Sequence, residues 1–322
     1  PRASECALLC PRIPYLAVGL TAPVCFRSPA GVSTGNSCRR WTFVLTARIA
    51  RVSADRVLLT NDDGIDAVGL RALYDALSDR YDVVTVAPSG DQSSIGRVLS
   101  DGVRVHDHDL GYAVDGTPVD CVVAGLDELV PDVDLVVAGC NEGANLGSYV
   151  LGRSGTVSAA VEAAVFGVPA VATSMYVPGG DDWWKTELEP EAFTHAVRAT
   201  RFLVDNAFDA DVFAEADYLN VNAPVAESQT APMRVTAPSD WYGLRADANG
   251  DGEVHFSDPI WGRMTPEDVP DPVGTDRRAV VEGEVSVSPL TVPHGTAAAS
   301  SLDDLADTYR EARGDKSAVD AE

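Results

Sequence analysis

The fold of this chain is decided by the stretch Val57-Leu58-Leu59-Thr60-Asn61-Asp62-Asp63-Gly64. It opens with a short apolar run, which is typical of a strand buried in a parallel sheet. Polar side chains and a glycine follow at once, so the strand ends in a turn. A helix is expected next, because apolar residues recur at helical spacing at Leu70, Leu73, Tyr74 and Leu77. The stretch therefore predicts the first strand and helix of an α/β domain.

The alternation of strand and helix continues along the chain. Apolar runs at 83–87, 135–138 and 170–172 predict further buried strands. An Ala-rich helix is expected from Ser154-Gly155-Thr156 to Gly167. This order indicates a doubly wound, mostly parallel α/β sheet. Right-handed crossovers place the carboxyl ends of its parallel strands at one edge, where ligands bind in such sheets.

Polar residues follow three of the predicted strands at that edge. Asp62 and Asp63 follow the first strand, Ser93 lies in the loop after the second, and Asn141 follows the strand at 135–138. Carboxylate, hydroxyl and amide oxygens suit a hard divalent cation, Mg²⁺ or Mn²⁺. The alternative for Asp62-Asp63-Gly64 alone is an Asx-type turn with a helix cap. Two adjacent carboxylates at a buried strand end repel each other without a cation, which favours the metal site.

A second candidate site lies at Ser154-Gly155-Thr156, the expected start of a helix. Exposed N–H groups and the helix dipole favour a phosphate at such a terminus, although Ser154 alone is equally consistent with an N-cap. Gly143, Gly147 and Gly152 precede it and allow the backbone to approach a ligand closely. The sequence has neither a G-x-G-x-x-G fingerprint nor a Walker A lysine motif, which disfavours NAD and P-loop chemistry.

The charge of the chain excludes some partners. The 322 residues carry a formal net charge of -25, and only two basic residues are lysines. Such a field repels phosphates, so we expect no nucleic acid duplex as a partner. No apolar run is long enough to span a membrane. The acids are spread along the chain, which suggests a surface adapted to a halophilic cytoplasm; an incidentally acidic protein is the alternative.

Residues 1–54 differ from the rest in composition. They hold seven arginines, one acid and four of the six cysteines. A signal peptide and a zinc knuckle are two alternatives for this segment, but it lacks the usual succession of regions of the first and the paired C-x₂-C ligands of the second. We expect a poorly ordered, non-native extension of translated upstream sequence, followed by one domain at 55–322. Cys121 and Cys140 lie in apolar stretches and are expected to be buried free thiols.

Two other motifs have less specific interpretations. His106-Asp107-His108 places two histidines on one face of a strand, as a zinc site requires, but its polar surroundings favour a solvated β-arm. Trp183-Trp184 can stack on a base or pack at a subunit contact.

Five ordered motifs resemble the SurE family of 5′/3′-nucleotidases, and the resemblance extends over residues 55–312. The motifs lie at 58–65, 87–93, 116–121, 139–147 and 154–157, and later family landmarks are matched at 219–224 and 285–290.

The resemblance implies a Rossmann-like domain with a smaller C-terminal part for oligomerisation, as a homodimer or homotetramer. It implies a cytoplasmic, divalent-metal phosphatase that hydrolyses nucleoside 5′-monophosphates, with activity on 3′-monophosphates left open. The family's metal ligands fall on Asp62, Asp63, Ser93 and Asn141, the first two also being the catalytic residues, and its phosphate-contacting positions on Asn61, Ser154, Gly155 and Thr156. Cys140 and Arg153 depart from the family pattern, and Arg153 adds a phosphate contact or alters substrate preference.

Two function classes remain beside the phosphatase. A nucleotide-sensing module needs no metal carboxylates, which counts against it, and a nucleotide-sugar transferase needs acceptor machinery that the sequence does not display. Metal-activated water is the favoured nucleophile of the phosphatase, with direct attack by Asp62 or Asp63 as the rival. We expect subunit contacts at 181–186 and at a C-terminal helix that presents Leu302, Leu305 and Tyr309 on one face.

Overall fold

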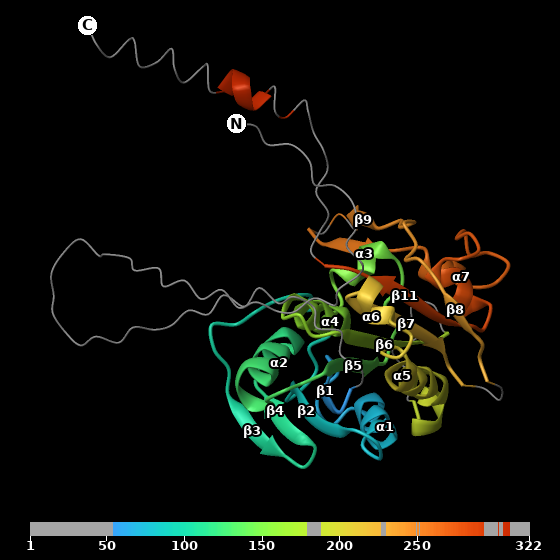
Figure 1. Cartoon of the computed structure of the whole chain (residues 1–322). Coiled ribbons are helices and arrows are strands. Elements are labelled where there is room, and N and C mark those ends of the chain that lie inside the picture. The colour runs from blue at the N-terminus through green and yellow to red at the C-terminus, as the bar shows by residue number, and fades with distance from the viewer. Residues whose placement is uncertain are drawn as a thin grey trace, which may run out of the picture. The chain divides into compact units, whose positions relative to one another are not determined.

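The computed structural model describes residues 54–178, 188–226, 230–248, 250, 252–292, 302 and 305–309 (Figure 1). The expected extension, apart from Ala54, and Trp183-Trp184 lie outside the described residues. Among the described helices, none is long and apolar enough to cross a membrane.

A nine-stranded sheet forms the centre of the described fold, in the order β3-β4-β2-β1-β5-β6-β7-β11-β8. The six strands from β4 to β7 run parallel, whereas β3, β11 and β8 run in the opposite direction. The expected doubly wound, mostly parallel sheet is therefore confirmed, with antiparallel strands at its edges. Its strands are β1 (Arg56–Thr60), β2 (Asp82–Pro88), β3 (Val105–His108), β4 (Gly111–Val114), β5 (Leu135–Asn141), β6 (Ala170–Tyr176), β7 (Tyr218–Pro224), β8 (Met233–Val235) and β11 (Val285–Leu290).

Helices cover both faces of the sheet (Figure 1). Helices α1 and α5 pack on one face, and α2 and α4 on the other. Strand β1 supplies both cores, because Val57 and Leu59 point to the first face and Leu58 to the second. The helical elements are α1 (Val68–Leu77), α2 (Pro118–Ala124), η1 (Gly125–Leu129), α3 (Ser148–Leu151), α4 (Gly155–Val165), η3 (Pro190–Phe193), α5 (Thr194–Asn206), α6 (Val212–Glu215), η4 (Trp261–Arg263) and α7 (Asp276–Val281).

Local sequence signals set the ends and faces of these helices. In α1, Leu70, Leu73 and Leu77 are fully buried, as their spacing predicts. Ser154 is the N-cap of α4, and its hydroxyl accepts a hydrogen bond from the Val157 N–H at 3.0 Å. Gly167, with φ +80°, follows the end of that helix. Cys121 and Cys140 are buried free thiols, as expected.

The strand order places a switch point between β1 and β5. The chain proceeds from β1 outward to β2 and β4 on one side, and from β5 outward to β6 and β7 on the other. The loops after β1 and β5 therefore diverge at the carboxyl ends of adjacent strands, the place where open α/β sheets bind ligands. Asp62 and Asp63 lie on the loop after β1, Ser93 lies on the loop after β2, and Asn141 is the last residue of β5.

The C-terminal part adds a second, two-stranded sheet beside the central one. Strands β9 (Arg245–Ala248) and β10 (Val254–Ser257) form an exposed antiparallel pair. A third apolar cluster packs this C-terminal part against the loop after β5. The buried members of the cluster are Leu146, Ile260, Met264, Val269 and Val280. Leu302, Leu305 and Tyr309 are exposed and helical, and their role in subunit contacts stays a prediction.

Candidate active site

The loop after β1 is closed by the side chain of Asn61. Its amide donates to the Gly64 carbonyl at 2.8 Å and accepts from the Gly64 N–H at 3.3 Å. Gly64 has φ +106°, a conformation that side chains with a Cβ rarely adopt. Asn61 is fully buried, and its side chain stabilises this turn. Its contact with phosphate stays a prediction.

Asp62 connects the end of β1 to the start of α4. The Thr156 hydroxyl donates a short hydrogen bond to Asp62 Oδ1, and the Thr156 backbone N–H bonds the same carboxylate. A Cβ built on Gly155 would lie 2.7 Å from both Asp62 Cβ and Asp62 Oδ2. Glycine at 155 therefore lets the helix terminus approach the carboxylate. The structure thus brings Asp62, Gly155 and Thr156 together, although 93 residues of sequence separate the first two.

Asp63 lies beside Asp62 in an acidic environment. The Glu142 backbone N–H donates to Asp63 Oδ2 at 3.2 Å, which links the loops after β1 and β5. Burial, followed by repulsion from Asp62, raises the pKa of Asp63 to about 7. Burial also raises the pKa of Asp62, although hydrogen bonds from Thr156 oppose the effect. Two carboxylates that disfavour each other's charge form a site suited to a cation.

Ser93 lies on the loop after β2, and Asn141 is the last residue of β5. The loop that carries Ser93 is fastened to the first, because the Gln92 N–H donates to the Asp62 carbonyl at 2.7 Å. Ser93 is exposed, and its hydroxyl donates to Asp91 Oδ1 at 2.6 Å. The Asn141 amide donates to the Gly143 carbonyl at 2.6 Å, which fixes the orientation of its plane. Ligation of a metal by either residue stays a prediction.

Two acidic residues at this site were missed in the sequence analysis. The Asp91 carboxylate acts electrostatically on Asp62 and Asp63, and the Glu142 carboxylate acts on Asp63; both raise the affected pKa values. Both residues could have been predicted from the sequence, because they lie within two positions of Ser93 and Asn141. A segment that brings one residue to a site also brings the neighbours of that residue. They add negative charge around the two aspartates.

The donor set fits a hard divalent cation. The predicted ligands offer only carboxylate, hydroxyl and amide oxygens, the ligands that Mg²⁺ and Mn²⁺ prefer. Among the described residues, no group of three or more His, Cys, Asp and Glu side chains is arranged to hold a metal. The predicted site therefore has two carboxylates, with neutral oxygen donors as its other expected ligands.

Ser154 is an N-cap, as one of the two interpretations predicted, because its hydroxyl accepts a hydrogen bond from the Val157 N–H. The cap engages the Val157 N–H and Asp62 engages the Thr156 N–H, so this terminus offers an anion the Gly155 N–H and the helix dipole. The terminus lies at the same strand end that holds the two aspartates. A phosphate at this terminus would therefore lie between the helix dipole and the proposed cation.

The two histidines at 106 and 108 lie elsewhere, on the edge strand β3. His106 Nε2 is 2.9 Å from Asp115 Oδ2, and His108 Nε2 is 3.3 Å from Asp66 Oδ1. The strand is mostly exposed, which agrees with the expected solvated arm.

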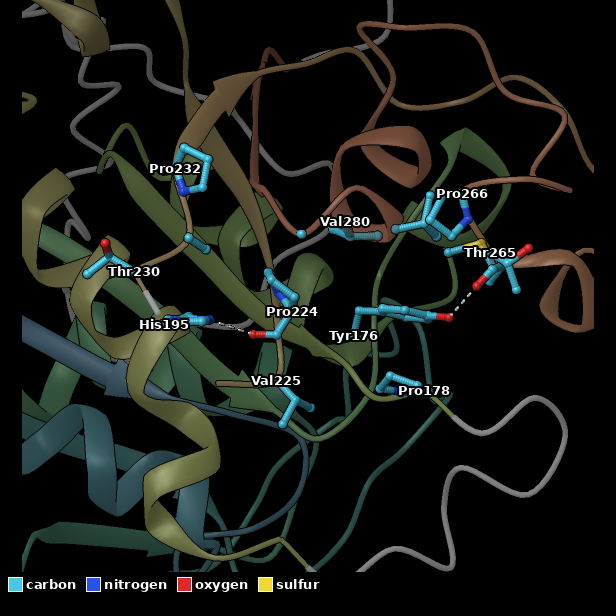
Figure 2. A pocket seen from close by; sticks show the side chains of 14 residues that line it. Tyr176, Pro178, His195, Pro224, Val225, Thr230, Pro232, Thr265, Pro266 and Val280 are labelled. Carbon is cyan, nitrogen blue, oxygen red and sulfur yellow. Dashed lines mark hydrogen bonds between the residues drawn. The ribbon is translucent and has the colours of Figure 1, made fainter. Parts of the chain in front are cut away.

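A cavity of about 550 Å³ lies beyond the ends of β6 and β7. Figure 2 shows Tyr176 and His195 among its lining residues, with His195 beside the Pro224 carbonyl at 3.3 Å and the Tyr176 hydroxyl donating to the Met264 carbonyl. None of the predicted site residues lines this cavity. The chemistry is therefore expected at the β1–β5 switch point.

Fold and site together define an α/β protein that gathers two carboxylates and a helix N-terminus at the switch point of a doubly wound sheet. The chain belongs to the SurE family: the family model described as Survival protein SurE matches residues 57–243. Proteins curated as 5′-nucleotidase SurE in Haloquadratum walsbyi and Natronomonas pharaonis are 60% and 62% identical over 255 and 258 residues. Each alignment covers 79% of this chain, and 96% and 99% of those relatives.

A solved structure supports the same family. The crystal structure of the SurE protein from Aquifex aeolicus matches with a TM-score of 0.60 at 30% identity, over 73% of this chain and 92% of that one. The Haloquadratum and Natronomonas relatives belong to halophilic archaea, which agrees with the halophilic interpretation of the charge.

Proposed function

We propose that this protein is a 5′-nucleotidase that hydrolyses nucleoside 5′-monophosphates to nucleoside and phosphate, with Mg²⁺ or Mn²⁺ as cofactor. The observation that supports this most strongly is the contact between the Asp62 carboxylate and the N-terminus of α4 through Thr156. This contact would place the proposed cation site beside the proposed phosphate site. The names of the curated relatives support the same substrate class.

Asp62, Asp63, Ser93 and Asn141 would hold the cation. When bound, it would offset the charge of the phosphomonoester dianion and lower the pKa of water. The remaining tasks belong to the chain itself. Thr156 holds the Asp62 carboxylate in one orientation, and the Gly155 N–H and the dipole of α4 would stabilise the equatorial phosphate oxygens as charge develops on them.

The proposed reaction is attack of water on phosphorus with cleavage of the bond to the ribose oxygen. The water oxygen forms the new bond, and one of its protons balances the departing alkoxide. Direct attack by Asp62 or Asp63 is the rival and would form an acyl phosphate first. In a single turnover in ¹⁸O-water, direct attack by water places the label in the released phosphate and forms no covalent intermediate. Carboxylate attack forms an acyl phosphate that can be trapped, and the label then enters the phosphate or the protein according to whether water attacks phosphorus or the carbonyl carbon.

The function is tested by phosphate release from adenosine 5′-monophosphate with and without EDTA. We expect release that EDTA abolishes and that added Mg²⁺ or Mn²⁺ restores. Release that persists in EDTA would contradict the metal assignment, and no release with any divalent cation would contradict the phosphatase itself. Parallel assays on 3′-monophosphates decide whether they are substrates as well.

Two further properties of the enzyme are proposed, its oligomeric state and its location in the cell. A homodimer or homotetramer built through the C-terminal part is proposed, because that part exposes Val254 and Phe256 on β10. A cytoplasmic location is proposed because a net charge of -25 suits a salt-rich cytoplasm. Sedimentation analysis of the purified protein measures the first, and cell fractionation the second.

A further inference from the structure

Three side chains near the start of α4 form one stack. The rings of Tyr149 and Tyr242 lie 5.0 Å apart between centroids at an interplanar angle of 11°. The Arg153 guanidinium carbon lies 4.3 Å from the centroid of the Tyr149 ring. Tyr149 is therefore the shared member of this stack, since both Arg153 and Tyr242 contact its ring.

The other two members of this stack are open to solvent. Arg153 is exposed, and the Tyr242 ring belongs to a residue that is 59% exposed. Arg153 directly precedes Ser154, the N-cap of α4, so the guanidinium layer lies on the chain next to the proposed phosphate site. Its carbonyl accepts from the Gly96 N–H at 3.1 Å, which fastens it to the end of the loop that carries Ser93.

A buried carboxylate holds the two tyrosine-bearing segments together. Asp276 is fully buried and accepts from the Gly147 N–H at 2.7 Å and from the Ser239 N–H at 3.0 Å. The Ser148 N–H then donates to the Ser239 carbonyl at 2.8 Å. The chain before Tyr149 and the chain before Tyr242 are thus fixed to each other. A stack anchored in this way is ordered before a ligand arrives, which reduces the entropy lost on binding.

We propose that the Arg153–Tyr149–Tyr242 stack is the nucleobase platform of this protein, with the base lying on the outer face of the Arg153 guanidinium. This inference rests on the proposed function, since it places the phosphate of a nucleoside monophosphate at α4. A planar guanidinium stacks on the face of a base. The contact with the Tyr149 ring restricts the positions that the guanidinium group can take. Stacking tolerates different bases, so the platform favours nucleotides over other phosphomonoesters without selecting one base.

The alternative role for Arg153 is an ion pair with the phosphate. One substitution distinguishes this role from stacking on the base. Arg153→Lys keeps the positive charge but removes the plane that stacks. The measurement is calorimetric binding, in EDTA to stop turnover, of adenosine 5′-monophosphate and of ribose 5-phosphate, which lacks the base. The decisive quantity is the ratio of the two affinities. Tyr149→Leu tests the shared ring, and Tyr149→Phe keeps it.

The wild-type protein is expected to prefer the nucleotide, and Arg153→Lys and Tyr149→Leu to reduce that preference about tenfold, the usual scale of one base stack. Tyr149→Phe is expected to keep the preference, as is Phe202→Ala, an exposed aromatic residue on α5. The proposal is overturned if the wild type shows no preference, if Arg153→Lys retains it, or if the variants weaken both ligands equally. Phosphate release is measured separately, so a platform that fails leaves the nucleotidase proposal intact.

Discussion

Helices α2 and α4 lie on the same face of the sheet, and a carboxylate contacts the N-terminus of each. The two carboxylates differ in where they come from in the chain. At α2, the Thr117 hydroxyl accepts from the Asp120 N–H while the Asp120 carboxylate accepts from the Thr117 N–H, a complete capping box. At α4, the carboxylate is Asp62, which comes from the end of β1. The first arrangement is local and satisfies its own groups. The second joins distant segments and adds the Asp63 carboxylate, so it leaves charge for a ligand to balance.

This contrast separates a structural helix end from a functional one. Asp120 also accepts from the Ser100 N–H and hydroxyl, both at 2.8 Å, so its oxygens are surrounded by donors. Asp62 and Asp63 instead repel each other, and both pKa values are raised. Substitutions at the two ends should therefore change different properties of the protein.

The largest effect is expected for Asp62→Asn and Asp63→Asn, which should abolish phosphate release. Each substitution removes a charged ligand for the cation but retains the shape of the side chain. The melting temperature should not fall, because one of two mutually repelling carboxylates is removed. Steady-state phosphatase assays beside thermal unfolding check this, and near-wild-type turnover in either variant would contradict the site.

Gly155→Ala should lower activity by at least about tenfold, since an added methyl in a tightly packed region must displace its neighbours. The new Cβ would meet Asp62 at 2.7 Å, so the carboxylate or the helix terminus must move. The value of kcat, measured at saturating nucleotide and metal, reports the change. Gly152→Ala is the matched control, because a Cβ there meets no atom within 4 Å; equal losses in both variants would count against the contact.

At the other helix end, Asp120→Ala should destabilise the protein by about 1–3 kcal/mol while kcat stays close to wild type. The substitution leaves the Thr117 and Ser100 donors without their acceptor. Urea unfolding gives the change in free energy of unfolding, and the phosphatase assay gives kcat. A loss of kcat without a loss of stability would remove the distinction between the two helix ends.

Salt should weaken the interactions of the buried carboxylates at the two helix ends less than it weakens the repulsion between exposed carboxylates. The Debye length falls from about 10 Å at 0.1 M salt to about 3 Å at 1 M, so exposed carboxylates repel each other less. Activity and oligomer size are therefore expected to rise together as KCl increases over this range. Light scattering beside the assay tests this, and a fully active, fully assembled protein at 0.1 M KCl would refute the halophilic interpretation.

The parts of this account that follow from local sequence were predictable. The apolar run at 57–59, the spacing of Leu70, Leu73 and Leu77, and the caps at Ser154 and Gly167 each depend on neighbours in the chain, and the structure confirms them. The antiparallel strands β11 and β8 were not predicted, because strand direction depends on pairing between distant segments.

The contacts within the site were less accessible to sequence reasoning. Nothing near Gly155 indicates that its missing side chain makes room for Asp62, since that contact exists only after β1 and α4 have packed. The same holds for Asp276, whose two backbone donors come from Gly147 and Ser239. Residue types and strand ends were enough to name the candidates, whereas their mutual orientation required the fold.

The central claim is that the aspartates beside α4 form a cation site, and Mn²⁺ binding tests it most directly. Titration of Mn²⁺ into the wild type, Asp62→Asn and Asp120→Asn, followed by electron paramagnetic resonance, measures binding without turnover. The account predicts saturable binding in the wild type and in Asp120→Asn, and its loss in Asp62→Asn. Equal Mn²⁺ binding in the wild type and in Asp62→Asn would contradict the account.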